Sequence, residues 1–166
     1  NEAANTVIKL VASTVDEICN AENPSLSAVL PESGERFQAV IPPASAAPFF
    51  VIRKKALMIF TLDDYVTSGI MTKNHADIIK KAVKERQNIL VVGGTGTGKT
   101  TLANAILQEI SKTNHRILTI EDTKELQCSA ENAVALFTKE PVYSIKMAVK
   151  DALRLRPDRI IVGEVR

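Results

Sequence analysis

The segment at residues 93–100 reads GGTGTGKT and matches the phosphate-binding pattern G-x-x-x-x-G-K-S/T. This pattern constrains the fold strongly, because it works only where a strand ends and a helix begins and successive backbone N–H groups converge on an anion. The apolar run at residues 89–92 predicts a buried strand before the loop, and residues 101–112 predict a helix after it. The chain is therefore expected to contain a phosphate-binding α/β unit.

The residue types in this loop predict how it would hold a nucleoside triphosphate. Lys99 is expected to reach the β- and γ-phosphates, and Thr100 is expected to offer its hydroxyl to Mg²⁺. The loop does not reveal the fate of the γ-phosphate, because kinases, switches and motors share it. The expected nucleotide-binding residues of the loop are Gly93, Gly94, Thr95, Gly96, Thr97, Gly98, Lys99, Thr100 and Thr101.

The part of the chain before the loop predicts a small α+β domain over residues 1–55. Apolar residues at helical spacing predict a helix over 5–20. Short strands separated by turn residues are then expected at 27–30, 36–41 and 49–53. A helix followed by short strands is typical of the α+β class.

The rest of the chain predicts a linker and a parallel α/β domain. The linker, residues 56–71, carries a short helix from about Thr61, and Thr72 is expected to cap the next helix. From residue 72 to 166 helices and strands alternate, as a parallel sheet requires. Besides the elements around the loop, strands are expected at 116–120 and 159–162 and a helix at 144–155.

Composition gives no support for nucleic acid binding or a membrane span. Lys and Arg total 21 against 19 Asp and Glu, and aromatic residues make up only 4%. No apolar run approaches the roughly 18 residues that a spanning helix needs. The isolated Cys19 and Cys128 fit a reducing compartment, so a cytoplasmic location is expected. The chain also starts without Met and stops directly after a strand-like run, which predicts an excerpt of a longer polypeptide.

Carboxylates follow two of the expected strands, at the sheet edge where ligands bind in such folds. Glu164 follows the run at 159–162 and is expected to orient or deprotonate the water that attacks the γ-phosphate. Glu121 and Asp122 follow the run at 117–120, and water, Glu121 or Asp122 is expected to complete the surroundings of Mg²⁺. These positions favour hydrolysis over transfer to another acceptor.

Three motifs together resemble the secretion ATPases of the type II and type IV systems. They are GGTGTGKTTL at 93–102, TIEDTKEL at 119–126 and ALRLRPDRIIVGEVR at 152–166. Three segments in the first half are similar in sequence to the TrbB-type conjugal transfer ATPases. They are ERFQAVIPP, FVIRK and FTLDDYV. The resemblance covers essentially the whole chain.

The resemblance implies a RecA-like ATPase domain after a small α+β domain, ATP and Mg²⁺ as cofactors, and a homohexameric ring. It implies partners among the inner-membrane components of a type IV secretion apparatus, with the protein peripheral at the cytoplasmic face. Glu121 and Asp122 match the acidic box of the family, which implies a catalytic role for Glu121 beside Glu164 and Lys99, and water-mediated Mg²⁺ contact for Asp122.

The same resemblance implies that arginines of the N-terminal domain approach the γ-phosphate. Arg53, in FVIRK, is the first candidate and Arg36 the second, because a guanidinium stabilises charge on a transferring phosphoryl group. Arg154 and Arg166 lie in the matched carboxy-terminal motif without an assigned role.

Two functions fit these expectations. The favoured one is an ATP-hydrolysing motor for assembly of, or transfer through, a conjugative type IV secretion apparatus. The alternative is a nucleotide-gated assembly scaffold in which ATP binding matters more than turnover. A kinase is disfavoured because Glu164 stands where water would be activated, and residues 1–166 alone are expected to hydrolyse ATP weakly or not at all.

Overall fold

The computed structural model describes residues 2–54 and 58–164. The chain divides into two compact units, Asn1–Leu57 and Met58–Arg166. Each unit has its own buried core and one three-stranded sheet, which is combined with one helix in the first unit and with four helices in the described part of the second. The structure is therefore mixed α/β, with an antiparallel sheet in the first unit and a parallel sheet in the second.

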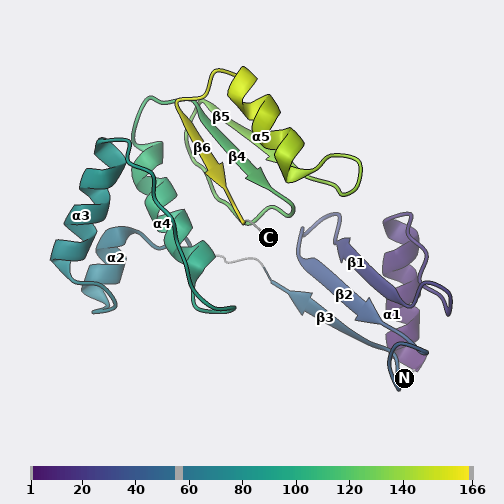
Figure 1. The fold of residues 1–166 in the computed structure, drawn as a ribbon. Coiled ribbons are helices and arrows are strands. Elements are labelled where there is room, and N and C mark those ends of the chain that lie inside the picture. The colour runs from purple at the N-terminus through teal and green to yellow at the C-terminus, as the bar shows by residue number, and fades with distance from the viewer. Residues whose placement is uncertain (1, 55–57, 165–166) are drawn as a thin grey trace. The chain divides into compact units, whose positions relative to one another are not determined.

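In the first unit, one helix packs on an antiparallel sheet of order β1-β2-β3 (Figure 1). Ile8 and Ala12 of the helix meet Leu26, Phe37 and Ala39 of the sheet in a buried cluster. The opposite face of the sheet has no helix in this unit. The elements are α1 (Glu2–Thr14), β1 (Ser25–Val29), β2 (Arg36–Val40) and β3 (Phe49–Arg53).

The second unit begins with two short helices whose starts are set by threonine caps. Thr61 and Asp64 form a capping box at the start of α2 (Leu62–Thr67). Thr72 accepts a hydrogen bond from the backbone N–H of His75 at the start of α3 (Lys73–Lys84). The predicted cap at Thr72 and the predicted short helix from about Thr61 are therefore present, and α2 and α3 pack beside α4 (Lys99–Ser111).

The parallel sheet of the second unit has the order β5-β4-β6 and is covered on both faces of its central strand. Leu118 and Ile120 of that strand pack against α5, whereas Ile117 belongs to the core shared with α4. Side chains alternate between the faces of a strand, so Glu121 lies on the same side as Ile117. The elements are β4 (Ile117–Glu121), β5 (Ala133–Phe137), α5 (Ile145–Arg154) and β6 (Arg159–Val162).

Residues 89–92 do not form the predicted strand. They are extended but carry no strand assignment, and the side chains of Leu90 and Val92 are 85% and 81% exposed. A β-strand needs a neighbour for its backbone hydrogen bonds, and in the described part of the chain no strand pairs with this segment. The predicted helix at 5–20 is also too long, because α1 ends at Thr14.

Candidate functional site

The phosphate loop leads directly into α4, as the sequence predicts. Gly98 precedes the helix with φ 90° and no side chain caps the first turn, so its backbone N–H groups face outward from the helix end. Gly93 approaches Thr97 so closely that a Cβ at Gly93 would lie 2.7 Å from Thr97 Oγ1. The loop thus depends on glycine for two left-handed residues, Gly96 and Gly98, and for one close approach at Gly93.

The polar side chains of the loop contact its own backbone. Lys99 Nζ donates to the carbonyl oxygen of Gly94 at 2.6 Å, and Thr97 Oγ1 donates to the same oxygen at 2.8 Å. The ammonium of Lys99 therefore lies across the loop, on the path that phosphate oxygens take in such sites. A helix N-terminus and a lysine together attract an anion.

Thr100 links this loop to the carboxylates that follow β4. Its Oγ1 donates to Glu125 Oε2 at 3.2 Å, across 25 residues of sequence. Hydroxyl and carboxylate oxygens are the hard ligands that Mg²⁺ prefers, usually one or two of them together with water and phosphate oxygens. Thr100 and Glu125 therefore fit the Mg²⁺ that the resemblance implies.

Glu121 lies at the end of β4 with its side chain buried. Its Oε2 accepts hydrogen bonds from the backbone N–H groups of Glu125 at 2.8 Å and Leu126 at 2.9 Å. Burial raises the pKa of the Glu121 carboxyl, while the two N–H donors act in the opposite direction. Glu121 thus holds the turn that presents Glu125, whereas the neighbouring Asp122 is exposed.

The structure brings Glu164 to the same edge of the sheet. β6 pairs in parallel with β4, and the N–H of Gly163 donates to the carbonyl oxygen of Ile120 at 2.8 Å. A Cβ at Gly163 would lie 3.1 Å from Cβ of Glu121, so this position favours a residue without a side chain. Glu164 follows as an exposed residue beyond the strand.

The two arginine candidates lie in the first unit and are direct neighbours. Arg36 of β2 is paired in register with Arg53 of β3. Both residues are on the sheet face turned away from α1, since Phe37 and Ala39 point toward the helix. The structure thus places Arg36 and Arg53 on one face of this sheet and at the same end of it.

Sequence reasoning missed Glu125. The signal was a second carboxylate four residues after Glu121 in the motif TIEDTKEL. Only the fold shows that the turn directs Glu125, rather than Glu121, toward Thr100. Arg154, on α5, is exposed, and Arg166 lies outside the described residues.

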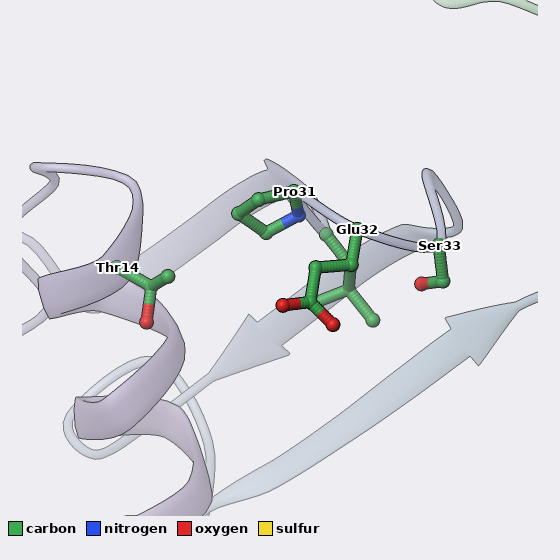
Figure 2. Close-up of a pocket in the computed structure, with 5 residues that line it drawn as sticks. Thr14, Pro31, Glu32 and Ser33 are labelled. Carbon is green, nitrogen blue, oxygen red and sulfur yellow. The ribbon is translucent and has the colours of Figure 1, made fainter.

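A pocket in the first unit has a different character. Figure 2 shows it between the end of α1 and the segment that follows β1. A single carboxylate and no cationic side chain line it, which does not suit a phosphate. Its lining residues are Thr14, Leu30, Pro31, Glu32 and Ser33.

The glycine loop, the helix that starts from it and the carboxylates at the sheet edge define a P-loop nucleotide-binding protein. The family model described as "Type II/IV secretion system protein" matches residues 4–166. The chain belongs to this family, as its motifs predict. Among residues 2–54 and 58–164, no helix combines the length and apolar character needed to cross a membrane.

Conjugal transfer proteins are among the most similar relatives. The conjugal transfer protein TrbB of Rhizobium radiobacter is 48% identical over 166 residues, covering 99% of this chain and 51% of that protein. The type IV secretion system protein VirB11 of Bartonella quintana is 32% identical over 200 residues, covering 96% of this chain and 56% of that protein. The chain thus spans about half the length of these relatives.

Solved structures confirm the predicted fold class. The VirB11 ATPase of the Brucella suis type IV secretion system, crystallised with sulphate, is 33% identical with a TM-score of 0.51, covering 98% of this chain and 57% of that chain. The pilus retraction motor PilT with bound ADP shares the fold at 23% identity and a TM-score of 0.62, covering 86% and 40% of the two chains.

Proposed function

We propose that this chain is the nucleotide-binding portion of an ATP-hydrolysing motor for a conjugative type IV secretion apparatus. The observation that carries the proposal is the contact of Thr100 with Glu125, which joins the phosphate-loop helix to the carboxylate edge of the sheet. The motor would energise assembly of the apparatus or substrate transfer through it. Similarity to conjugal transfer proteins supports this choice of system.

In the proposed reaction the γ-phosphoryl group of ATP passes to water and gives ADP and phosphate. The loop N–H groups and Lys99 bind the phosphates and offset the charge that develops on them. Glu164 orients the attacking water from the end of β6 and accepts its proton. Bound Mg²⁺ would supply electrostatic stabilisation of the phosphate oxygens, held by Thr100 together with Glu125 and, through water, Asp122.

The arginine pair of the first unit is proposed to complete the site. A guanidinium stabilises the charge on a transferring phosphoryl group, so Arg53, with its strand neighbour Arg36 as the second candidate, is proposed to approach the γ-phosphate. We further propose a homohexamer that works with inner-membrane components of the apparatus, at the cytoplasmic face.

Two substitutions in the full-length protein test the proposal. Lys99→Ala is expected to lower ATP affinity and to reduce phosphate release by about 100-fold or more, because it removes a charge that contacts the transferring group. Glu164→Gln is expected to bind ATP as tightly as the wild type while phosphate release falls by about 100-fold. Equilibrium binding of ATP and a phosphate-release assay measure the two effects.

Lys112→Ala is the matched control, because Lys112 lies just after the other end of α4 with an exposed side chain that pairs with Glu109. Unchanged ATP binding by Lys99→Ala would refute the nucleotide site. Full hydrolysis by Glu164→Gln would refute the role of Glu164. Conjugal transfer by a Glu164→Gln strain that binds but does not hydrolyse ATP would favour the scaffold over the motor.

A further inference from the structure

The described part of the chain places two buried polar side chains against one short turn. The buried polar or charged residues among those that the structure describes are Asn104, Thr119 and Glu121. Asn104 and Glu121 both bind the backbone of residues 125–127, from different elements. Burying polar groups costs free energy unless their hydrogen bonds are made, so two such groups on one turn fix its position closely.

Asn104 uses both ends of its carboxamide. Its Nδ2 donates to the carbonyl oxygen of Glu125 at 3.0 Å, and its Oδ1 accepts from the N–H of Gln127 at 2.9 Å. One helical turn further along α4, Gln108 Nε2 donates to the carbonyl oxygen of Gln127 at 3.1 Å. Residues 125–127 therefore lie along α4, which binds the backbone of the alternate residues Glu125 and Gln127.

The same helix face supplies the partner of the Glu125 side chain. Thr100 and Asn104 are four residues apart and are thus neighbours on one face of α4. Thr100 contacts the Glu125 carboxylate, Asn104 holds the Glu125 carbonyl, and Glu121 receives the Glu125 N–H from the strand side. The position of the carboxylate relative to the hydroxyl is therefore set by Asn104 through the backbone of Glu125.

We propose that Asn104 is a positioning residue for ATP hydrolysis, which holds Glu125 in register with Thr100 and so places the oxygen ligands for Mg²⁺. The proposal rests on the proposed function and deepens it. Asn104 itself acts only through Glu125, one turn away from the hydroxyl that would meet the metal. Removing a residue that holds a metal ligand in place typically lowers metal affinity or activity by about 10- to 100-fold.

Asn104→Asp is the sharpest test in the full-length protein. The aspartate keeps an acceptor for the Gln127 N–H but loses the donor to the Glu125 carbonyl and sets a carboxylate against that oxygen. The Mg²⁺ concentration for half-maximal hydrolysis is expected to rise about 10-fold, and kcat to fall about 10-fold. ATP affinity measured with EDTA present should stay within about 2-fold of wild type, because Lys99 and the loop remain intact.

A second readout needs neither nucleotide nor metal. Backbone hydrogen exchange at Gln127 should accelerate by about 10-fold or more in Asn104→Asp and Asn104→Ser, because the turn loses a partner on α4. Asn114→Asp makes the same chemical change at an exposed residue just beyond the helix and should match the wild type in every assay. Asn104→Ser replaces Asn104→Asp in all measurements should the aspartate variant fail to fold.

The outcomes separate this inference from the proposed function. A wild-type protein without ATPase activity would refute the proposed function first. An active wild type whose folded Asn104 variants keep its Mg²⁺ dependence and kcat would refute only the positioning role. A lowered melting temperature with unchanged Mg²⁺ dependence would show a structural role and would equally overturn the inference.

Discussion

The two ends of the parallel sheet β5-β4-β6 carry opposite kinds of side chains. At the carboxyl end, Glu121 binds a turn of backbone and Glu125 contacts the first turn of α4. At the amino end, arginines and a histidine bind one another and the end of α3. The first end presents acceptor oxygens to a backbone turn and to the helix after the phosphate loop, whereas the second end joins elements of the fold.

The amino end connects the segment before the phosphate loop to the strands. Arg159, at the start of β6, donates to the carbonyl oxygen of Val83 on α3 and to His115 Nδ1 at 3.2 Å. Arg86 Nη2 lies 2.8 Å from His115 Nε2, and Arg86 Nη1 lies 3.8 Å from a carboxylate oxygen of Asp158. This cluster therefore ties α3 to β6 and to the residues before β4.

The two ends also respond oppositely to acid. Burial raises the pKa of Glu121 in the folded state, so its contribution to stability is present at low pH and is lost as the pH rises through the folded pKa. Burial and the charges of Arg86 and Arg159 lower the pKa of His115, against a smaller opposing effect of Asp158. The contribution of His115 is therefore present above its unfolded pKa and is lost as the pH falls.

The largest effect is expected from the carboxyl end. Glu121→Ala leaves the N–H groups of Glu125 and Leu126 without their acceptor, which should lower the free energy of unfolding by about 3 kcal/mol. Glu121→Gln keeps an acceptor oxygen and should cost less than half as much. Urea unfolding measures both, with the exposed Glu131→Ala as control.

Measuring phosphate release by Glu121→Gln then distinguishes a structural from a catalytic role of Glu121 at the carboxyl end of the sheet. A well-folded Glu121→Gln protein that hydrolyses ATP would assign Glu121 to holding the turn. Loss of hydrolysis in that variant, with stability retained, would instead support the catalytic role expected from the acidic box. Equal stability of the alanine and glutamine variants would contradict the hydrogen-bonding argument.

Sequence patterns predicted the local features of this molecule well because local chemistry determines them. The cap at Thr72 follows from a hydroxyl before a helix, and the loop follows from its glycines. By contrast, residues 89–92 and 117–121 are similarly apolar, yet only the second segment is a strand. Strand formation depends on a neighbour that a local pattern does not reveal.

The features that the sequence did not predict are those that depend on contacts between residues far apart in the chain. β5 was missed although Ala133–Phe137 is entirely apolar, because periodicity alone does not distinguish a short apolar strand from a helix segment. Glu121 was placed correctly at a strand end. Which carboxylate of its motif faces Thr100 depends on the turn at 125–126 and on Asn104, and therefore on tertiary packing.

At the amino end, removing Arg159 should have a moderate effect. Arg159→Met keeps the aliphatic part of the side chain but loses the charged donor to the Val83 carbonyl, which should lower the free energy of unfolding by about 1–2 kcal/mol. Urea unfolding of the variant measures this, with Arg154→Met on the exposed face of α5 as control. Equal stability of the two variants would show that the cluster does not tie α3 to the sheet.

The smallest expected effect concerns the pH dependence of stability at the amino end of the parallel sheet. A neutral imidazole has one lone pair, yet both ring nitrogens of His115 face arginine N–H groups, so protonation removes the only acceptor and adds a third positive charge. Between pH 7.5 and 5.5 the melting temperature of the wild type should fall about 2 °C further than that of His115→Gln. His75→Gln, at an exposed position, should keep the wild-type slope. Identical slopes in wild type and His115→Gln would show that the two ends of the sheet do not differ in their response to acid, because the histidine of the arginine cluster would then contribute nothing.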